Sequence, residues 1–353
     1  MKKCFWLWMG VLLITAVISA CQRPVDLQTE DSQSDFPAFE RPEKGYIRAN
    51  PLPVGEPIQT ANWTVDVLNF ARGQEAWEQI KALPYNDEPP GIGEEYVVMQ
   101  LRASHTNENA EEDAVGISLT GSEGLRYFSF DSDLTGPTPY LNTILPGGES
   151  HEGWYTFVIA EGETDLMLVV DDYAILDDPL LYAAVEEGAS LLVPDELTAV
   201  IPTNRGKDIR EPAPFGSIVT NEDWEMTVTD VIIGDEAWDI LLEANQFNDP
   251  PANDTNYILV KIKVRHIGGG DEPVDMSSYH VRLLNGEHEE YDTPVLVEPV
   301  PRFDFDLYPG AEAEGWIAFA GFKDDSGFML RFNPEYSSNS PEIRYLSLDA
   351  TGR

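Results

Sequence analysis

The sequence predicts a mainly β protein made of two tandem antiparallel β-sandwiches, each with one short helical crossover. Three observations predict this fold: strand-like alternation of apolar and polar residues, a long internal repeat, and a single helix-like pattern in each copy of that repeat. Short alternating segments separated by Gly, Pro and Asn turns are typical of antiparallel sandwiches.

The repeat relates two halves of the chain. Several residues of the first half, most of them aromatic, recur 161 residues later. Further along, the separation is 163 for a Pro-Gly pair and then 162 for the last tryptophan pair. The matched residues are Trp63 with Trp224, Trp77 with Trp238, Tyr96 with Tyr257, His105 with His266, Trp154 with Trp316, and Pro146-Gly147 with Pro309-Gly310. We therefore expect one sandwich at residues 51–198 and a second at 214–353, joined by a polar, Pro-rich linker at 199–213.

Within each copy, period-two segments predict the strands. The segment "YILVKIKV" places Ile258, Val260, Ile262 and Val264 on one face and two lysines on the other. The segments "ASLLV" and "IRYLSL" are the predicted last strands of the two copies. The residues predicted to fill the core are the repeated tryptophans, Trp63, Trp77, Trp154, Trp224, Trp238 and Trp316.

The helical pattern occurs in "EAWEQIKALPYNDEPP" and again in "EAWDILLEANQFNDPP". Apolar residues recur at helical spacing, acids occupy the first turn, and prolines end each unit. We interpret the unit as a crossover whose tryptophan plugs the sandwich and whose Asn-Asp-Pro-Pro tail turns the chain back. Its outer acids, Glu75, Glu78, Glu236 and Asp239, form the surface that we expect a partner to contact.

The amino terminus predicts export. Two lysines precede "FWLWMGVLLITAVISA", an apolar run too short for a comfortable membrane span and typical of a signal peptide at residues 1–20. The sequence Ile18-Ser19-Ala20-Cys21 resembles the lipobox of bacterial lipoproteins. That resemblance implies acylation of Cys21, anchoring to a membrane, and a location in the bacterial cell envelope outside the cytoplasm. An ordinary signal peptide is the alternative. Residues 21–50, polar and Pro-punctuated, are predicted to form a flexible tether.

Composition excludes several classes of function. The chain has 63 acidic and 22 basic residues, a net charge of −41, so nucleic-acid binding is not expected. It has two cysteines, Cys4 in the signal peptide and Cys21, so no disulfide or thiol chemistry is expected in the mature protein.

Calcium is the cofactor that this composition favours most, because calcium binds carboxylate oxygens. The candidate ligands are the alternating acids Asp131 and Asp133 in "DSDLTG" and Asp304 and Asp306 in "DFD". The first of these segments does not complete an EF-hand, because its twelfth position is Asn142 rather than Glu. The five histidines form no recognised metal or catalytic motif, and no catalytic residues are predicted.

The assembled pattern resembles a family of bacterial extracellular and lipoprotein domains of unknown function with a telokin-like, immunoglobulin-like sandwich, also called immunoprotective-extracellular domains. The matching features are "VGEPI" or "FGSIV" before a Trp strand, then a Gly and the helix, and a later hairpin containing "EGW". The resemblance implies an immunoglobulin-like fold, an envelope location and a function other than catalysis.

We therefore predict a non-catalytic, lipid-anchored surface module that binds an unknown envelope protein or glycan, or acts as a spacer. The first alternative is a calcium-binding acidic envelope domain, and the second is a hydrolase of glycans or peptides. A hydrolase would need two placed carboxylates in an aromatic cleft.

Overall fold

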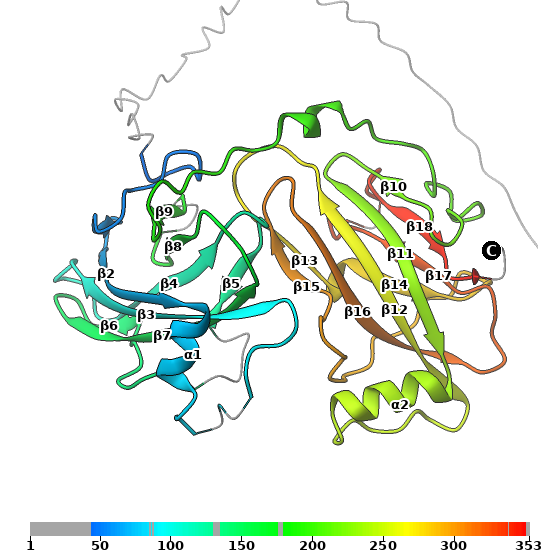
Figure 1. The fold of residues 1–353 in the computed structure, drawn as a ribbon. Coiled ribbons are helices and arrows are strands. Elements are labelled where there is room, and N and C mark those ends of the chain that lie inside the picture. Colours follow the sequence, from blue (N-terminus) through cyan, green and yellow to red (C-terminus); the bar gives the residue numbers. More distant parts are fainter. Residues whose placement is uncertain are drawn as a thin grey trace, which may run out of the picture. The chain divides into compact units, whose positions relative to one another are not determined.

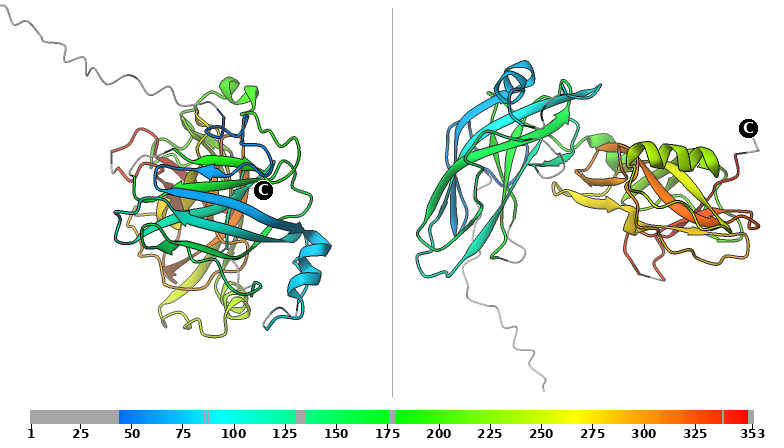
Figure 2. Two further views of the ribbon diagram at one scale, coloured as in Figure 1. Left: turned by 90° about the vertical axis from the view of Figure 1, so that its left-hand side faces the viewer. Right: turned by 90° about the horizontal axis from the view of Figure 1, so that it is seen from below.

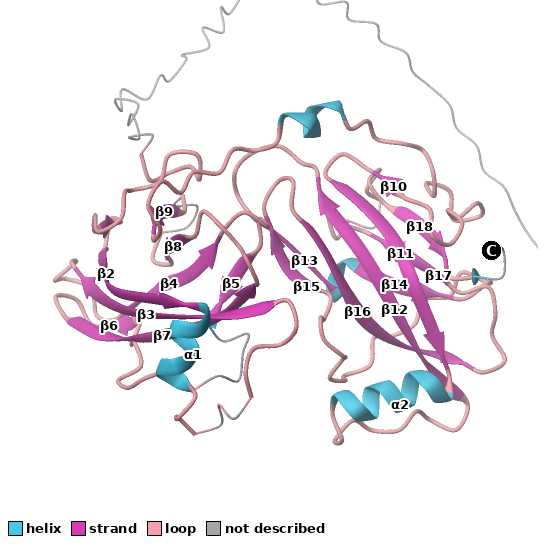
Figure 3. Ribbon diagram, viewed as in Figure 1, coloured by secondary structure: helices cyan, strands magenta, loops and turns pink. Residues whose placement is uncertain are grey.

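Strands dominate the computed structural model, which describes residues 44–350 apart from 85, 87, 130–134, 176–178 and 338 (Figures 1 and 3). The α-helices among the described residues are α1 (Gly73–Ile80) and α2 (Asp235–Ala244). All the strand pairs are antiparallel, and they form two tandem sandwiches. The predicted mainly β fold, with one short helix in each sandwich, is confirmed.

The first sandwich has two sheets. One has the order β1-β2-β3-β7, and the other has the order β5-β4-β8-β9 with β6 also paired to β4. The strands are β1 (Ile58–Gln59), β2 (Trp63–Arg72), β3 (Glu94–His105), β4 (Asp113–Thr120), β5 (Arg126–Phe128), β6 (Ile144–Leu145), β7 (Ser150–Ala160), β8 (Met167–Asp172) and β9 (Leu181–Ala184).

The second sandwich repeats this plan. Its sheets have the orders β10-β11-β12-β16 and β14-β17-β18, and β13 pairs separately with β15. The strands are β10 (Val219–Thr220), β11 (Trp224–Ile233), β12 (Thr255–His266), β13 (Val274–Ser277), β14 (Val281–Leu284), β15 (Asp304–Leu307), β16 (Glu312–Phe322), β17 (Met329–Phe332) and β18 (Arg344–Ser347).

Alternation along the strands builds each core. In β12, Ile258, Val260, Ile262 and Val264 are buried between the sheets, as predicted. Each long hairpin also contains a register shift at the same place in the repeat, between Val67 and Asn69 in β2 and between Val228 and Asp230 in β11. Such bulges bend a strand and increase its twist, so both sheets are bent at the same place.

The "EGW" motif has a geometric reason. A side chain at Gly153 would place its Cβ 2.3 Å from Leu141 N, and one at Gly315 would place it 2.5 Å from Arg302 O. In both copies a neighbouring segment lies against the strand at this point, because Trp154 and Trp316 donate backbone hydrogen bonds to Pro139 O and Pro301 O. The repeated glycine is therefore required by close backbone approach.

The helices lie on the outer face of their sheets, which corrects the prediction that Trp77 and Trp238 plug the sandwich. Trp63 and Trp224 are buried between the sheets, 0% and 2% exposed. The other repeated tryptophans, Trp77, Trp154, Trp238 and Trp316, are only partly buried and pack in clusters under the helices. The sheet presents apolar residues on both faces here, and each helix covers the outer one; Figure 2 shows α2 lying across its sheet.

Three predicted boundaries differ from the structure. The last strand of the first sandwich is β9, and "ASLLV" is not a strand. Residues 45–50 of the predicted tether pack on the sandwich, since Gly45 and Leu52 exchange backbone hydrogen bonds with Tyr182. The end of the predicted linker packs on the second sandwich, where Ala213 is buried beside β18. In the tether and the linker, backbone pairing orders segments that composition alone marks as polar.

All the described residues belong to one compact unit, so the sandwiches contact each other. Arg48, 3% exposed, donates to Asp271 from both its backbone N and Nε, and its guanidinium lies 3.9 Å from the Tyr308 ring centre. Tyr308 also packs with Tyr182 of β9 in a separate apolar cluster. These contacts explain why the outer face of β8, which would otherwise face solvent, is apolar.

Candidate binding site

The acids predicted to contact a partner lie on the outer faces of the helices. Glu75 and Glu78 on α1, and Glu236 and Asp239 on α2, are all exposed. Glu78 accepts a hydrogen bond from Gln74 and pairs with Lys81. The four acids are accessible to a partner, as expected. None of them lines the pocket described below.

One asparagine in the tail after each helix fastens that helix. Asn86 Nδ2 donates to Ile80 O at the end of α1 and to Thr135 O, and its Oδ1 accepts from Thr135 N. Asn248 makes the same three bonds in the second copy, to Leu241 O and to both backbone groups of Val297. Both asparagines are buried, so the repeated polar tail is structural.

The repeated histidines are structural too. His105 stacks on Trp63 at 4.6 Å, and His266 stacks on Trp224 at 4.7 Å. Each Nδ1 donates to a backbone carbonyl, that of Leu145 or Leu307, and both rings are buried. Burial lowers the pKa of His266, which keeps the ring neutral. These side chains are held in the core, away from any substrate.

A second group contains the residue types of a catalytic triad but not its geometry. Asp275, Ser277 and His280 meet at the short 3-10 helix Ser278–His280. His280 Nδ1 accepts a hydrogen bond from the Ser277 backbone N, and Ser277 Oγ donates to Asp275 rather than to the ring. This is a capping box that closes the helix, and it leaves the serine without a base.

The structure describes two of the four predicted calcium ligands. Asp131 and Asp133 lie outside the described residues, as does Cys21. Asp304 and Asp306 lie on strand β15, not on a loop. Within residues 44–350, as far as the structure describes them, no group of three or more His, Cys, Asp or Glu side chains is placed to hold a metal ion.

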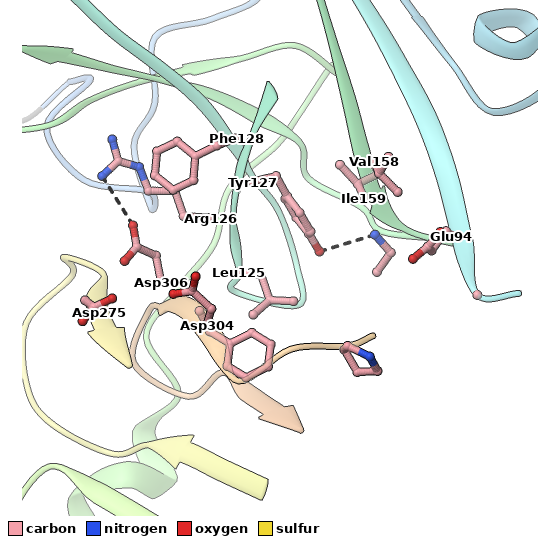
Figure 4. Close-up of a pocket in the computed structure, with 14 residues that line it drawn as sticks. Glu94, Leu125, Arg126, Tyr127, Phe128, Val158, Ile159, Asp275, Asp304 and Asp306 are labelled. Carbon is pink, nitrogen blue, oxygen red and sulfur yellow. Dashed lines mark hydrogen bonds and ion pairs between the residues drawn. The ribbon is translucent and has the colours of Figure 1, made fainter. Parts of the chain in front are cut away.

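Asp304 and Asp306 do line a pocket of about 460 Å³ that we call the junction pocket (Figure 4). It lies where β5 of the first sandwich meets β15 of the second, at the backbone bridge between Leu125 and Leu307. Its remaining lining residues are Gly93, Glu94, Leu125, Arg126, Tyr127, Phe128, Val158, Ile159, Ala160, Asp275, Pro301 and Phe305.

Arg126 is the cation of the junction pocket. Its side chain is 10% exposed, its Nε donates to Ser118 Oγ at 2.8 Å, and its guanidinium lies 4.9 Å from the Phe128 ring centre. The Nη atoms reach carboxylates only at long range, 3.6 Å to Asp171 and 3.9 Å to Asp306. Nη2 is buried and makes no hydrogen bond.

The acids of the pocket come from paired strands. Asp275 on β13 stands directly opposite Asp306 on β15, and Ser277 stands opposite Asp304, so all four side chains project from one face. Burial, and then the neighbouring Asp275 carboxylate, raise the pKa of Asp304. Figure 4 shows Asp275, Asp304, Asp306 and Arg126 gathered on one side of the cavity, with Tyr127, Val158 and Glu94 on the other.

A buried carboxyl group supports the pocket wall from behind. Tyr127 donates to Glu163 Oε2 and accepts a hydrogen bond from Ala160 N, while Glu163 Oε1 accepts from Glu123 N. Burial raises the pKa of Glu163 to about 7. Arg72 donates to the Glu163 carbonyl and also pairs with Glu95 and Glu186. The network fixes the turn at 121–125 that meets the second sandwich.

The lining of the junction pocket combines charged and apolar groups. Its described residues include no His, Cys or Ser. They do supply one guanidinium, several carboxylates and the apolar side chains of Leu125, Phe128 and Phe305, which is the composition of a ligand pocket.

Sequence reasoning identified Asp304 and Asp306 but missed Arg126, Asp275 and Tyr127. Arg126 and Tyr127 lie on a strand of three residues, too short for any periodicity to mark. The one available signal was the scarcity of bases: the segment 51–200 is strongly acidic, and an arginine beside aromatic residues in "GLRYF" stands out against it.

The family comparison matches a segment of the second sandwich. Residues 213–343 match the family described as "Domain of unknown function (DUF4352)". No curated protein matches the chain. Within the described residues, no helix is both long and apolar enough to cross a membrane.

Solved bacterial structures show weak similarity. YcdA from Bacillus subtilis, described as a lipoprotein candidate, is 14% identical over 37% of this chain and 38% of its own length, with a TM-score of 0.30. YjhA from the same organism is 12% identical over 38% of this chain and 99% of its own, with a TM-score of 0.28. An uncharacterised β-sandwich protein from Clostridium difficile is 12% identical, with coverages of 42% and 99% and a TM-score of 0.23. Such low TM-scores carry no argument about this chain.

Proposed function

We propose that this chain is a non-catalytic binding module of the bacterial cell envelope, held to a membrane by lipid at Cys21. The observation that carries the binding role is the junction pocket, to which both sandwiches contribute charged side chains. The lipobox-like sequence before Cys21 supports the anchor. The partner is an envelope protein or glycan reached outside the cytoplasm.

We also infer that the first sandwich is a divergent copy of the domain matched at residues 213–343, and that both copies have the telokin-like, immunoglobulin-like fold. Three equivalences support this inference: the Trp–His stacks, the asparagine clamps of the helices, and the glycine at the "EGW" motif. Their separation along the chain is 161 residues for the tryptophans and histidines and 162 for the asparagines and glycines, and such a nearly constant separation is expected of a duplicated domain.

The junction pocket is a better binding surface than the helix acids. Isolated exposed carboxylates attract a partner only weakly, because water and salt screen them. In the pocket, by contrast, Arg126 is largely withdrawn from solvent and the carboxylates converge on one space, which strengthens their electrostatic interactions with a bound group.

Photocrosslinking in cells tests the proposal. A photoreactive amino acid at Phe128, which lines the junction pocket, is expected to capture a specific envelope component from the full-length protein. The same amino acid at Glu236 on the exposed face of α2 is the matched control. If Glu236 captures the partner and Phe128 captures nothing, the pocket is not the binding site.

A spacer is the second candidate function, favoured by the clamp of Arg48 on Asp271 and Tyr308. A buried arginine that binds both oxygens of one carboxylate, through its backbone N and its Nε, and that also stacks on a tyrosine holds two domains more firmly than exposed ion pairs do. A spacer would need no partner at the pocket. The absence of crosslinks from both Phe128 and Glu236 would therefore favour this role.

The calcium-binding and hydrolase alternatives remain separate proposals. Calcium would act through the carboxylates of Asp304 and Asp306, and a hydrolase would use two of the pocket acids. A panel of glycans and peptides tests the hydrolase: hydrolysis that disappears in Asp304→Asn would replace the binding role by an enzymatic one.

A further inference from the structure

We propose that a second site, a polar groove within the second sandwich, binds a neutral glycan. The polar groove consists of two adjoining cavities of about 590 and 220 Å³ that share Ser278, Tyr279 and Glu298. Residues of the 3-10 helix Ser278–His280 and of the segment 290–304 line it. Asp304 is the one residue that also lines the junction pocket. The inference therefore goes beyond the proposed function, and each site can be tested without the other.

Tyr279 is the exposed aromatic side chain of the polar groove. In the first sandwich one uninterrupted strand, β4, pairs with β6 and then with β8. The corresponding strand of the second sandwich is split into β13 and β14 by the 3-10 helix Ser278–His280 (Figure 1). The capping box of Ser277 and His280 closes this helix, and Tyr279 at its centre is 69% exposed. The added helix thus presents an aromatic ring at the groove.

Two further side chains of the groove are also particular to the second sandwich. The asparagine clamps of the helices place Glu298 at the position of Gly136 in the first sandwich. The backbone bridges to the tryptophans of the "EGW" motifs place Arg302 at the position of Tyr140. The first sandwich forms the same fold without counterparts of Tyr279, Glu298 and Arg302. Folding therefore does not require these three side chains, and they are the ones that contact the ligand.

The chemistry of the groove matches a sugar. Burial raises the pKa of Glu298, although backbone N–H groups and the nearby Arg302 guanidinium oppose the rise. An arginine only donates hydrogen bonds and an ionised carboxylate only accepts them, whereas a hydroxyl group does both. A ligand rich in hydroxyl groups can therefore use Glu298 and Arg302 together. The apolar C–H face of a pyranose ring packs on an aromatic ring, and Tyr279 supplies one.

The charge of the groove favours a neutral glycan over an anionic one. Its acids are Glu290, Asp292, Glu298 and Asp304, and its bases are Arg282 and Arg302. Arg282 already pairs with Glu290 at 3.5 Å. An anionic sugar would meet an excess of carboxylates, and juxtaposed like charges weaken binding. The larger cavity, of about 590 Å³, falls within the range of small-ligand sites.

Saturation-transfer NMR titrations of the purified full-length protein test the proposal. The neutral probes are maltotriose, cellotriose and triacetylchitotriose, the anionic probe is trigalacturonic acid, and the peptide probe is N-acetyl-trialanine amide. At least one neutral trisaccharide should bind, with a Kd on the order of 1 mM for a small ligand in an open groove. Trigalacturonic acid and the peptide should bind about tenfold more weakly or not at all, because the one is repelled and the other lacks hydroxyl groups.

Variants locate the bound sugar. Tyr279→Ala should weaken the best neutral probe about tenfold, the upper range for the loss of one aromatic contact. Tyr279→Phe keeps the ring and should bind like the native protein. Tyr140→Ala removes a tyrosine of the first sandwich that is 53% exposed, and it should change nothing. Glu298→Gln keeps one acceptor oxygen but loses the charge, so it should weaken binding about threefold.

Any of four outcomes overturns the proposal. These are no binding of a neutral trisaccharide at about 10 mM, equal binding of trigalacturonic acid, tighter binding of the peptide than of any sugar, or sugar binding that Tyr279→Ala leaves unchanged. The third outcome would assign the groove to a peptide. Equal melting temperatures of Tyr279→Ala and the native protein exclude misfolding, and photocrosslinking from Phe128 tests the junction pocket separately.

Discussion

Glu163 makes the stability of the first sandwich depend on pH in a direction opposite to that of most carboxylates. The side chain is 2% exposed and accepts hydrogen bonds from Tyr127 and from Glu123 N. Its pKa rises from 4.5 to about 7 because burial penalises the charged form. In the unfolded chain the same carboxyl group titrates near the ordinary value.

The sign follows from proton binding. Between about pH 4.5 and 7 the folded state keeps the Glu163 proton while the unfolded state loses it, so raising the pH favours unfolding. Each pKa unit corresponds to about 1.4 kcal/mol, and the shift therefore amounts to about 3 kcal/mol at most. Glu163→Gln removes the titration and keeps a side chain that can still accept from Tyr127.

Urea unfolding at pH 5, 6, 7 and 8 measures the effect. The free energy of unfolding of Glu163→Gln, minus that of the native protein, should increase by about 2 kcal/mol between pH 5 and 7 and by less than about 0.5 kcal/mol between pH 7 and 8. Glu187→Gln, an exposed carboxyl group of the same sandwich, should give a difference that is flat with pH. A flat difference for Glu163→Gln as well would refute the assignment of a buried, protonated carboxyl group.

Four further outcomes follow from the structure. Asn248→Ala should lower the free energy of unfolding by about 2–4 kcal/mol in urea unfolding, since it leaves three backbone partners unsatisfied; a loss below 0.5 kcal/mol would contradict the clamp. Gly315→Ala should lower the melting temperature more than Gly269→Ala, whose Cβ would meet open space; equal melting temperatures would argue against close packing. Cys21→Ser should move the protein from the membrane to the soluble fraction on cell fractionation, and continued membrane association would count against the lipid anchor. Calcium should raise the melting temperature no more than NaCl of equal ionic strength, whereas a larger rise that Asp304→Asn abolishes would favour the calcium-binding alternative.

The sequence predicted the fold well because the strands keep strict period two and the tryptophans mark the repeat. Trp63 and Trp224 are buried as their strand pattern predicts. The error concerned Trp77 and Trp238. Helical periodicity identifies which face of a helix is apolar, but not which face of a sheet it covers. Tyr96 and Val98, on the outer face of β3, were the available clue that this sheet is apolar on both sides.

The junction pocket was less predictable for a physical reason. Its acids, Asp275 and Asp306, become neighbours only through the pairing of β13 with β15. Arg126 joins them from the other sandwich, across a contact between segments far apart in the chain. No pattern within one segment of the sequence shows that these residues come together. Taken alone, the alternating acids in "DFD" indicate calcium ligands. The structure places them on a strand, beside a cation.

Methyl NMR spectroscopy tests most directly the claim that the junction pocket is the binding site. The reporter methyl groups are those of Leu125 and Val158 in the pocket, with Leu242 on the exposed face of α2 as the reference. Addition of the envelope component captured by crosslinking from Phe128 should shift the Leu125 and Val158 signals together and leave Leu242 unchanged. A shift confined to Leu242 would contradict the account.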